Sequence, residues 1–157
     1  TAVAQISKES DLKLQQLERA FKTDPSAQNL NEYCDFLGEY LGSGLAEGRV
    51  AQIQRQQYAR LLARRCERED TFDLRIRYAT ALADVGQIDE AQAVTDQLVL
   101  DVPDEQEVWM LCLRLAVMRR DGDEVHRVID AIDKQHVYLS ADNREKLAFW
   151  RDGEEAR

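Results

Sequence analysis

The stretch Phe72–Glu105, FDLRIRYATALADVGQIDEAQAVTDQLVLDVPDE, contains the pattern that decides the fold. When this stretch is shifted by 34 residues onto the sequence from Gln106 onward, its apolar positions coincide with apolar positions there. The matching pairs are Leu74 with Val108, Tyr78 with Cys112, Ala81 with Leu115, Ala91 with Val125 and Leu98 with Ile132. A fixed period of this length is typical of stacked helix-turn-helix units. The sequence therefore predicts a helical repeat protein.

Residues that break helices divide the chain into further predicted elements. Gly86 and Gly122 are expected to form the turns inside two successive helix pairs, and Pro103 is expected to end the first of them. The predicted helices between the two ends of the chain span residues 27–41, 45–66, 72–84, 89–100, 105–120 and 123–133.

The two ends of the chain each have a helix start signal. Ser10 and Asp11 are expected to cap a first helix that stops at Pro25. Ser140 is expected to cap a last helix, after which residues 153–157 form a frayed tail.

These elements predict an all-α fold, a right-handed superhelical stack of antiparallel helix pairs with about three to four units. Residues 1–157 are expected to form a single domain, and the first residue, Thr1, is consistent with a piece of a longer protein. The unit over residues 28–71 is ten residues longer than the 34-residue unit that follows. The extra residues surround Gly42 to Gly48, and the sequence leaves open whether they are functional or a neutral variation.

Charge is unevenly distributed along the chain. Residues 49–77 contain eight arginines and four acidic residues, whereas residues 84–107 contain eight acidic residues and no Lys or Arg. A basic and an acidic surface are therefore expected on successive units, although charged helix faces are also ordinary solvated surfaces. The formal net charge of -9 argues against a nucleic-acid partner, because phosphate binding depends on an excess of basic residues.

The sequence gives no sign of catalytic or cofactor chemistry. Cys34, Cys66 and Cys112 lack metal or redox spacing, and buried thiols are expected at Cys34 and Cys112. His126 and His136 are too far apart to form a helical metal pair. We therefore expect no metal, no cofactor and no enzymatic activity. No apolar run is long enough to span a bilayer. Buried free thiols favour a reducing compartment, so a cytoplasmic location is expected, with the periplasm as the alternative for a fragment of an envelope protein.

Small and turn residues at fixed positions give the chain a family resemblance. The residues that carry it are Tyr78, Ala79, Leu82, Gly86, Ile88, Ala91 and Pro103 in one unit, and Trp109, Gly122 and Val125 in the next. This arrangement resembles the tetratricopeptide repeat (TPR), although Thr95 stands where a large aromatic residue is usual. Within that class, the sequence is broadly similar to the repeat region of bacterial exopolysaccharide export proteins of the Pel type.

The resemblance implies that the first helices of successive units line a concave groove for a protein or peptide partner. The partner-binding residues carried over in this way are Phe36, Tyr40, Ile76, Thr80, Met110, Arg114, Val117 and Met118. The apolar members could instead pack against neighbouring helices or against sequence outside this chain. Arg114 is expected to be either exposed or paired, with Glu107 or with an acid of the ligand as its partner.

Three functional hypotheses follow from the sequence. The first is a non-catalytic scaffold that docks a partner protein, in a bacterial envelope or secretion assembly. The second is a helical-hairpin protein that binds RNA through the arginines of residues 49–77. The third is self-association as a homo-oligomer through the terminal helices, because the C-terminal end is apolar for a cap, with Leu139, Leu147, Phe149 and Trp150.

Overall fold

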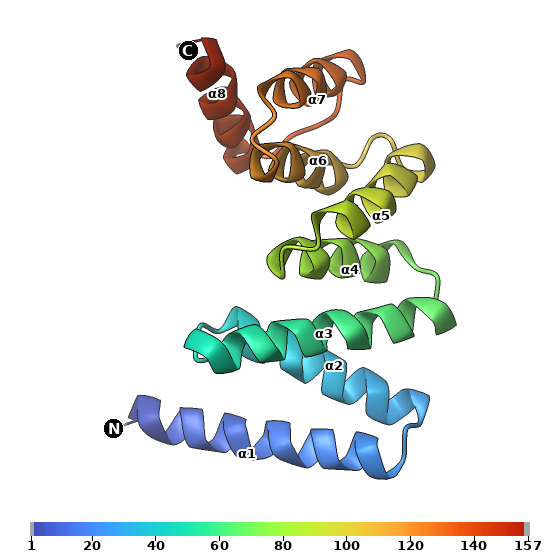
Figure 1. The fold of residues 1–157 in the computed structure, drawn as a ribbon, viewed down its shortest axis with the longest axis vertical. Coiled ribbons are helices and arrows are strands. Elements are labelled where there is room, and N and C mark those ends of the chain that lie inside the picture. Colours follow the sequence, from blue (N-terminus) through green and yellow to red (C-terminus); the bar gives the residue numbers. More distant parts are fainter. Residues whose placement is uncertain (1, 156–157) are drawn as a thin grey trace. The chain divides into compact units, whose positions relative to one another are not determined.

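A computed structural model describes residues 2–155, over which the chain forms eight α-helices and no strand (Figure 1). The helices are α1 (Ala2–Thr23), α2 (Ala27–Gly42), α3 (Gly48–Arg68), α4 (Phe72–Asp84), α5 (Ile88–Asp101), α6 (Gln106–Met118), α7 (Gly122–Lys134) and α8 (Ala141–Glu155). The predicted all-α helical repeat is thereby confirmed. The helices belong to two compact units, Thr1–Leu74 and Arg75–Arg157.

In the first unit, α2 packs between α1 and α3 and contributes five buried residues, among them Leu30 and Leu37. The turn that leads into α2 is held by side chains. Ser26 is the N-cap residue, and its hydroxyl accepts a hydrogen bond from the Asn29 backbone N–H. The Asn29 amide in turn donates to the carbonyl of Asp24, at 2.8 Å. These bonds satisfy backbone groups that the end of α1 and the start of α2 leave unpaired.

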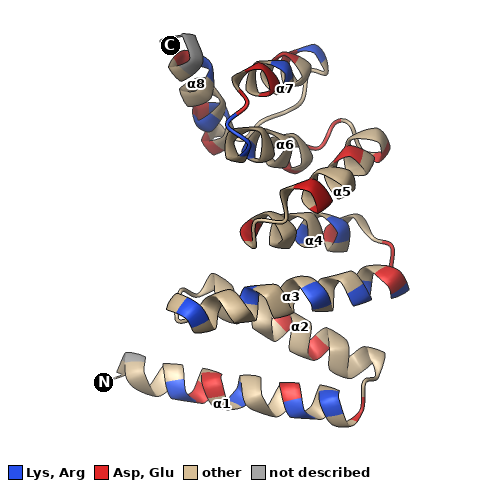
Figure 2. Cartoon of the chain, viewed as in Figure 1, with Lys and Arg blue, Asp and Glu red and all other residues tan. Residues whose placement is uncertain are grey.

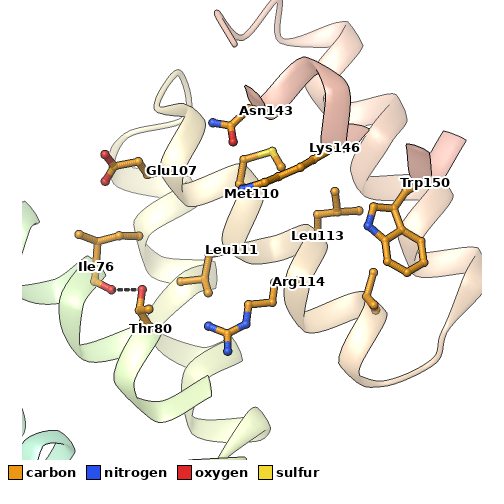
Figure 3. Close-up of a pocket in the computed structure, with 11 residues that line it drawn as sticks. Ile76, Thr80, Glu107, Met110, Leu111, Leu113, Arg114, Asn143, Lys146 and Trp150 are labelled. Carbon is orange, nitrogen blue, oxygen red and sulfur yellow. Dashed lines mark hydrogen bonds between the residues drawn. The ribbon is translucent and has the colours of Figure 1, made fainter. Parts of the chain in front are cut away.

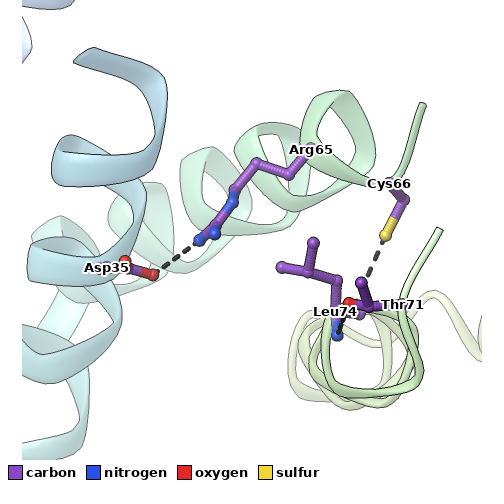
Figure 4. A network of polar contacts seen from close by, with 5 residues as sticks. All are labelled: Asp35, Arg65, Cys66, Thr71 and Leu74. Atoms are coloured by element: carbon purple, nitrogen blue, oxygen red, sulfur yellow. Dashed lines mark hydrogen bonds and ion pairs between the residues drawn. The ribbon is translucent and has the colours of Figure 1, made fainter. Parts of the chain in front are cut away.

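A buried arginine and a glycine hold α3 close to α2. Arg65 is only 8% exposed, and its guanidinium donates to the Asp35 carboxylate of α2 at 2.6 Å (Figure 4). A Cβ atom on Gly38 would lie 2.7 Å from the Tyr58 hydroxyl oxygen, so any larger residue there would force the Tyr58 side chain to move. Removing the Asp35 carboxylate would leave the buried guanidinium with one of its partners missing, although the Asp35 side chain is 53% exposed and water can replace part of that contact.

Two helix starts in this unit differ from the prediction. The first helix begins at Ala2, so Ser10 and Asp11 lie inside it and do not cap it. The residues before Ser10 are mostly good helix formers, which makes continuing the helix cheaper than starting it there. The third helix begins at Gly48, three residues later than expected. Its first turns carry Val50 and Ile53 on the surface, where both side chains are exposed.

In the second unit, α6 occupies the middle and packs against both α5 and α7. Seven of its residues are buried, and the Trp109 indole N–H donates to the Pro103 carbonyl at 2.7 Å. The 34-residue match seen in the sequence reappears as matched burial in four of its five pairs, while Tyr78 is half-buried. The fully buried Thr95, in the slot where an aromatic was expected, satisfies its hydroxyl by donating to the Ala91 carbonyl.

The turns that end α4 and α6 are the same structure, 34 residues apart. Gly86 has a φ of 79°, and its N–H and that of Gln87 bond back to the carbonyls of Ala83 and Leu82. Arg120 takes the corresponding place with a φ of 55°. The prediction that Gly122 makes this turn was therefore wrong, because Gly122 is the first residue of α7. Position 120 keeps the left-handed turn despite having a side chain.

The last helix begins as predicted, with the Asn143 backbone N–H donating to the Ser140 hydroxyl. Gly153 is helical, so the expected frayed tail is absent up to Glu155, and Ala156 and Arg157 lie outside the described residues. Leu139 and Leu147 are buried in the core of the second unit. Of the four residues that make this end apolar for a cap, only Phe149 is exposed, at 67%, and Trp150 is half-buried.

The left-handed backbone at Arg120 predicts a stabilising substitution. Arg120→Gly is expected to raise the free energy of unfolding by about 1 kcal/mol, because a left-handed φ strains any residue that has a Cβ atom. Arg120→Ala keeps the Cβ atom and should give no such gain. Urea unfolding followed by circular dichroism measures both.

The reverse substitution is the matched control. Gly86→Arg is expected to lower the free energy of unfolding by about 1 kcal/mol. No atom lies within 4 Å of a Cβ built on Gly86, so the loss comes from the backbone conformation and not from a clash. Equal stability of wild type, Arg120→Gly and Gly86→Arg would contradict the assignment of the two turns.

Candidate functional site

The second unit contains a pocket of about 520 Å³ that could hold a ligand (Figure 3). Helices α4, α6 and α8 form its walls. The lining residues are Ile76, Thr80, Glu107, Met110, Leu111, Leu113, Arg114, Val117, Asn143, Lys146 and Trp150. Pockets of this volume hold small ligands or one to two large side chains of a partner.

Helical spacing explains how these residues reach one place. On α6 the lining side chains recur three or four residues apart, as in Met110, Arg114 and Val117. On α4 the two lining residues are one turn apart, and the Thr80 hydroxyl donates to the Ile76 carbonyl at 2.7 Å. This bond satisfies the polar end of Thr80 within its own helix, so its methyl group is left to face the apolar pocket.

Arg114 carries its charge into the pocket with a partner already in place. Its guanidinium donates to the Asp84 carboxylate at 2.7 Å, and both side chains are 43% exposed. Arg114 is thus both exposed and paired, the two states that the sequence allowed, and its partner is Asp84 at the end of α4 and not Glu107. A pair this exposed adds at most about 1 kcal/mol of stability. Its main effect is to cancel the local positive charge.

The pocket rim carries two further charges of opposite sign. Glu107 on α6 and Lys146 on α8 are exposed, and neither forms an ion pair with any side chain that the structure describes. Asn143 is fixed, since its amide donates to the Gln106 side-chain oxygen at 2.9 Å. The same oxygen accepts from the Ser140 backbone N–H, and the two bonds anchor the start of α8 to α6.

Five of the eight residues predicted to bind a partner line this pocket: Ile76, Thr80, Met110, Arg114 and Val117. Met118 is half-buried at the end of α6 and does not line it. Phe36 and Tyr40 belong to the first unit, where α1 contacts both. The Lys13 ammonium lies 4.6 Å from the centre of the Phe36 ring, and the Tyr40 hydroxyl donates to the Asp11 carboxylate at 2.6 Å.

The contact with Asp11 also fixes the protonation of Tyr40. This hydrogen bond, together with burial and the negative charge of Asp11, raises the pKa of the Tyr40 hydroxyl to about 12. The phenol therefore stays protonated and keeps donating to Asp11 throughout the neutral range. These two aromatic side chains of α2 serve the packing of α1.

Sequence reasoning missed the contribution of α8 to the pocket. Extending the 34-residue period from Met110 and Arg114 points to Arg144 and Ala148, but both are exposed outside the pocket. The lining residues of α8 are instead Asn143, Lys146 and Trp150. Leu147 is buried in the core, and this fixes the rotation of α8 about its axis. The side of α8 that faces the pocket is therefore not the side that the 34-residue period predicts.

The described residues offer little for metal or redox chemistry. No group of three or more His, Cys, Asp or Glu residues in the described part of the chain is placed to hold a metal ion. None of the three cysteines forms a disulfide in the described structure, and Cys34 and Cys112 are buried as predicted. No helix within residues 2–155 is long and apolar enough to cross a membrane.

Comparison with known proteins agrees with the helical pairs. The family model described as tetratricopeptide repeat matches residues 45–115, a range that includes α3, α4 and α5 and most of α6. Searches of curated proteins and of solved structures found no significant match. The family match and the eight described helices support a TPR-like protein. The narrower resemblance to Pel-type export proteins receives no support from these comparisons.

The burial of the thiols predicts their order of reaction. Burial raises the pKa of the Cys112 thiol to about 12, and the charge of Asp96 adds to the effect. At pH 8 only about one molecule in ten thousand would then carry the reactive thiolate at this position. We expect iodoacetamide to label the half-buried Cys66 first, and Cys34 and Cys112 only after unfolding, as read by mass spectrometry of tryptic peptides.

The control for this experiment is Cys66→Ser, which should leave the folded protein unlabelled over the same time. Labelling of Cys112 in the folded protein as fast as that of Cys66 would contradict the burial of α6.

Proposed function

We propose that the protein is a non-catalytic interaction module, and that the pocket between α4, α6 and α8 binds a segment of a partner protein. The observation that carries the proposal is the pocket itself, an open apolar site of about 520 Å³ with charged residues at its rim. TPR repeats commonly mediate interactions between proteins, and the family match supports that general role.

The floor of the pocket suits large apolar side chains. Met110, Val117 and Trp150 are only half-buried, so each still has apolar surface to cover. Covering such surface is favourable by about 25 cal/mol for each Å² removed from water. Met110 adds adaptability, because its flexible thioether fits ligands of differing shape.

The charges around the pocket would orient the segment. Asp84 already neutralises Arg114, so the centre of the site has little need of a charged ligand group. Glu107 and Lys146 remain available on two different helices. A segment with apolar residues in the middle and an acidic group placed to meet Lys146 would match this pattern. Because helices and not loops form the walls, little ordering is needed on binding.

We also propose a cytoplasmic location, because the three cysteines form no disulfide in the described structure and cytosolic thiols are kept reduced. The periplasmic envelope or secretion assembly expected as an alternative rests on the sequence resemblance alone.

A displayed random-peptide library tests the pocket directly. Selection on the wild-type protein is expected to enrich peptides with large apolar residues. Met110→Glu places a carboxylate in the apolar floor and should weaken binding of the selected peptides at least about tenfold, as measured by calorimetry. The change in Trp150 fluorescence on binding should disappear in Trp150→Phe, while the buried Trp109 serves as an internal reference.

Tyr138→Glu is the matched control, since Tyr138 is 79% exposed in the same unit and does not line the pocket. It should bind the selected peptides as the wild type does. Peptides that lose affinity equally in Tyr138→Glu and Met110→Glu, or in neither, would remove the pocket from the proposal.

A second prediction concerns the rim. Lys146→Glu should weaken selected peptides that carry an acidic residue about tenfold and leave neutral ones within about twofold, because only the former lose an attraction and gain a repulsion. Lys134→Glu, an equal charge change on α7 outside the pocket, should affect neither class. Equal losses for acidic and neutral peptides in Lys146→Glu would contradict an orienting role.

A further inference from the structure

The exposed side of α3 carries a row of arginines together with apolar residues. We call this side the arginine face; its residues are Arg49, Val50, Ile53, Gln56, Arg60 and Arg64. Ile53 follows Arg49 by four residues, Arg60 follows Ile53 by seven, and Arg64 follows Arg60 by four. These spacings place the four residues on one side of the helix. All six are exposed, and Val50 and Ile53 are 63% and 60% exposed.

Two of the three arginines of this face have no partner among the residues that the structure describes. Arg64 lies over the Phe21 ring, with 5.6 Å between its guanidinium carbon and the ring centre. Arg49 and Arg60 make no ion pair or hydrogen bond with any residue that the structure describes. Arginine is enriched at protein interfaces, and the exposed Val50 and Ile53 side chains add apolar surface that a contact would cover.

The exposed side of α5 has the opposite character. Its residues, which we call the acidic face, are Asp89, Glu90, Ala93, Asp96, Gln97 and Leu100. All six are exposed, and Leu100 is 75% exposed. Figure 2 shows acidic residues and no basic ones along α5, whereas basic residues recur along α3. Asp89 pairs with Arg119, but Glu90 is in no ion pair among the described residues.

The two faces complement each other in charge and in apolar content. We propose that the arginine face of one copy of the chain binds the acidic face of α5 of a second copy. Arg49 and Arg60 would meet carboxylates such as Glu90 and Asp96, and Leu100 would cover Ile53 or Val50. Each face is the exposed side of the second helix of its pair, so neither contact disturbs the pocket or the helix packing described above.

The chemistry of the chain favours this occupant over nucleic acid. The net charge of -9 repels a polyphosphate, and the arginine face mixes its charges with aliphatic residues where base stacking would call for aromatic ones. The same net charge opposes the approach of two copies, so the contact depends on matched charges. Because unlike faces meet, a dimer still has one arginine face and one acidic face open, and association grows with concentration beyond the dimer.

Charge reversal with complementation tests the proposal by light scattering over a range of protein concentrations. One double variant, Arg49→Glu with Arg60→Glu, makes both faces acidic. The other, Glu90→Arg with Asp96→Arg, makes both basic. The wild type is expected to gain mass with concentration, and each variant alone should associate at least about tenfold more weakly. An equal mixture of the two should regain association, because each reversed face then meets its complement.

Lys134→Glu with Arg144→Glu is the matched control. It changes the net charge as much as the arginine variant does, but at exposed positions outside both faces, and should associate like the wild type. Circular dichroism verifies that all variants are folded. A wild type that stays monomeric, variants that associate unchanged, or a mixture that fails to regain association would overturn the proposal. Retention of single-stranded RNA that is lost only in the arginine variant, without self-association, would overturn it in favour of nucleic acid.

Discussion

The burial of α6 is the interaction on which the second unit depends. This helix packs against α5 and α7 and buries seven of its thirteen residues, all of them apolar. It could not be stable alone in water, because its apolar surface needs neighbours on two sides. The half-buried apolar residues of this helix are Met110, Val117 and Met118, and the strip with Met110 and Val117 lines the pocket. The constraint that makes the repeat fold therefore also produces the candidate site.

Much of the fold could be predicted because burial repeats every 34 residues. The period placed α4 to α7 within about two residues of their bounds, and Pro25, Gly86 and Ser140 marked real boundaries. The errors arose where local signals compete. Ser10 looks like a cap but lies within a run of good helix formers. The turn was predicted at Gly122 because glycine favours turns, but it lies at Arg120. Arg120 adopts a left-handed φ because the helix ends on either side of it are fixed by packing.

The candidate site could be predicted only in part, for a related reason. Ile76, Met110 and Arg114 follow from the repeat, because α4 and α6 keep its register. Helix α8 does not, since Leu147 turns toward the core and brings Trp150 to the pocket. Phe36 and Tyr40 are covered by contacts with residues of α1, which lies far away in the sequence. No local pattern reports such long-range contacts, and the partner of Arg114 was missed for the same reason.

The central claim is that the uncovered strip of α6 is the surface that a partner covers. The chain contains only two methionines, and they differ in this respect: Met110 lines the pocket and Met118 does not. Methyl NMR of protein labelled at methionine therefore gives two signals, each reporting on one place. Titration with a peptide selected on the wild type should shift the Met110 signal strongly and the Met118 signal little. A shift confined to Met118, or no shift of either signal at saturation, would contradict the account.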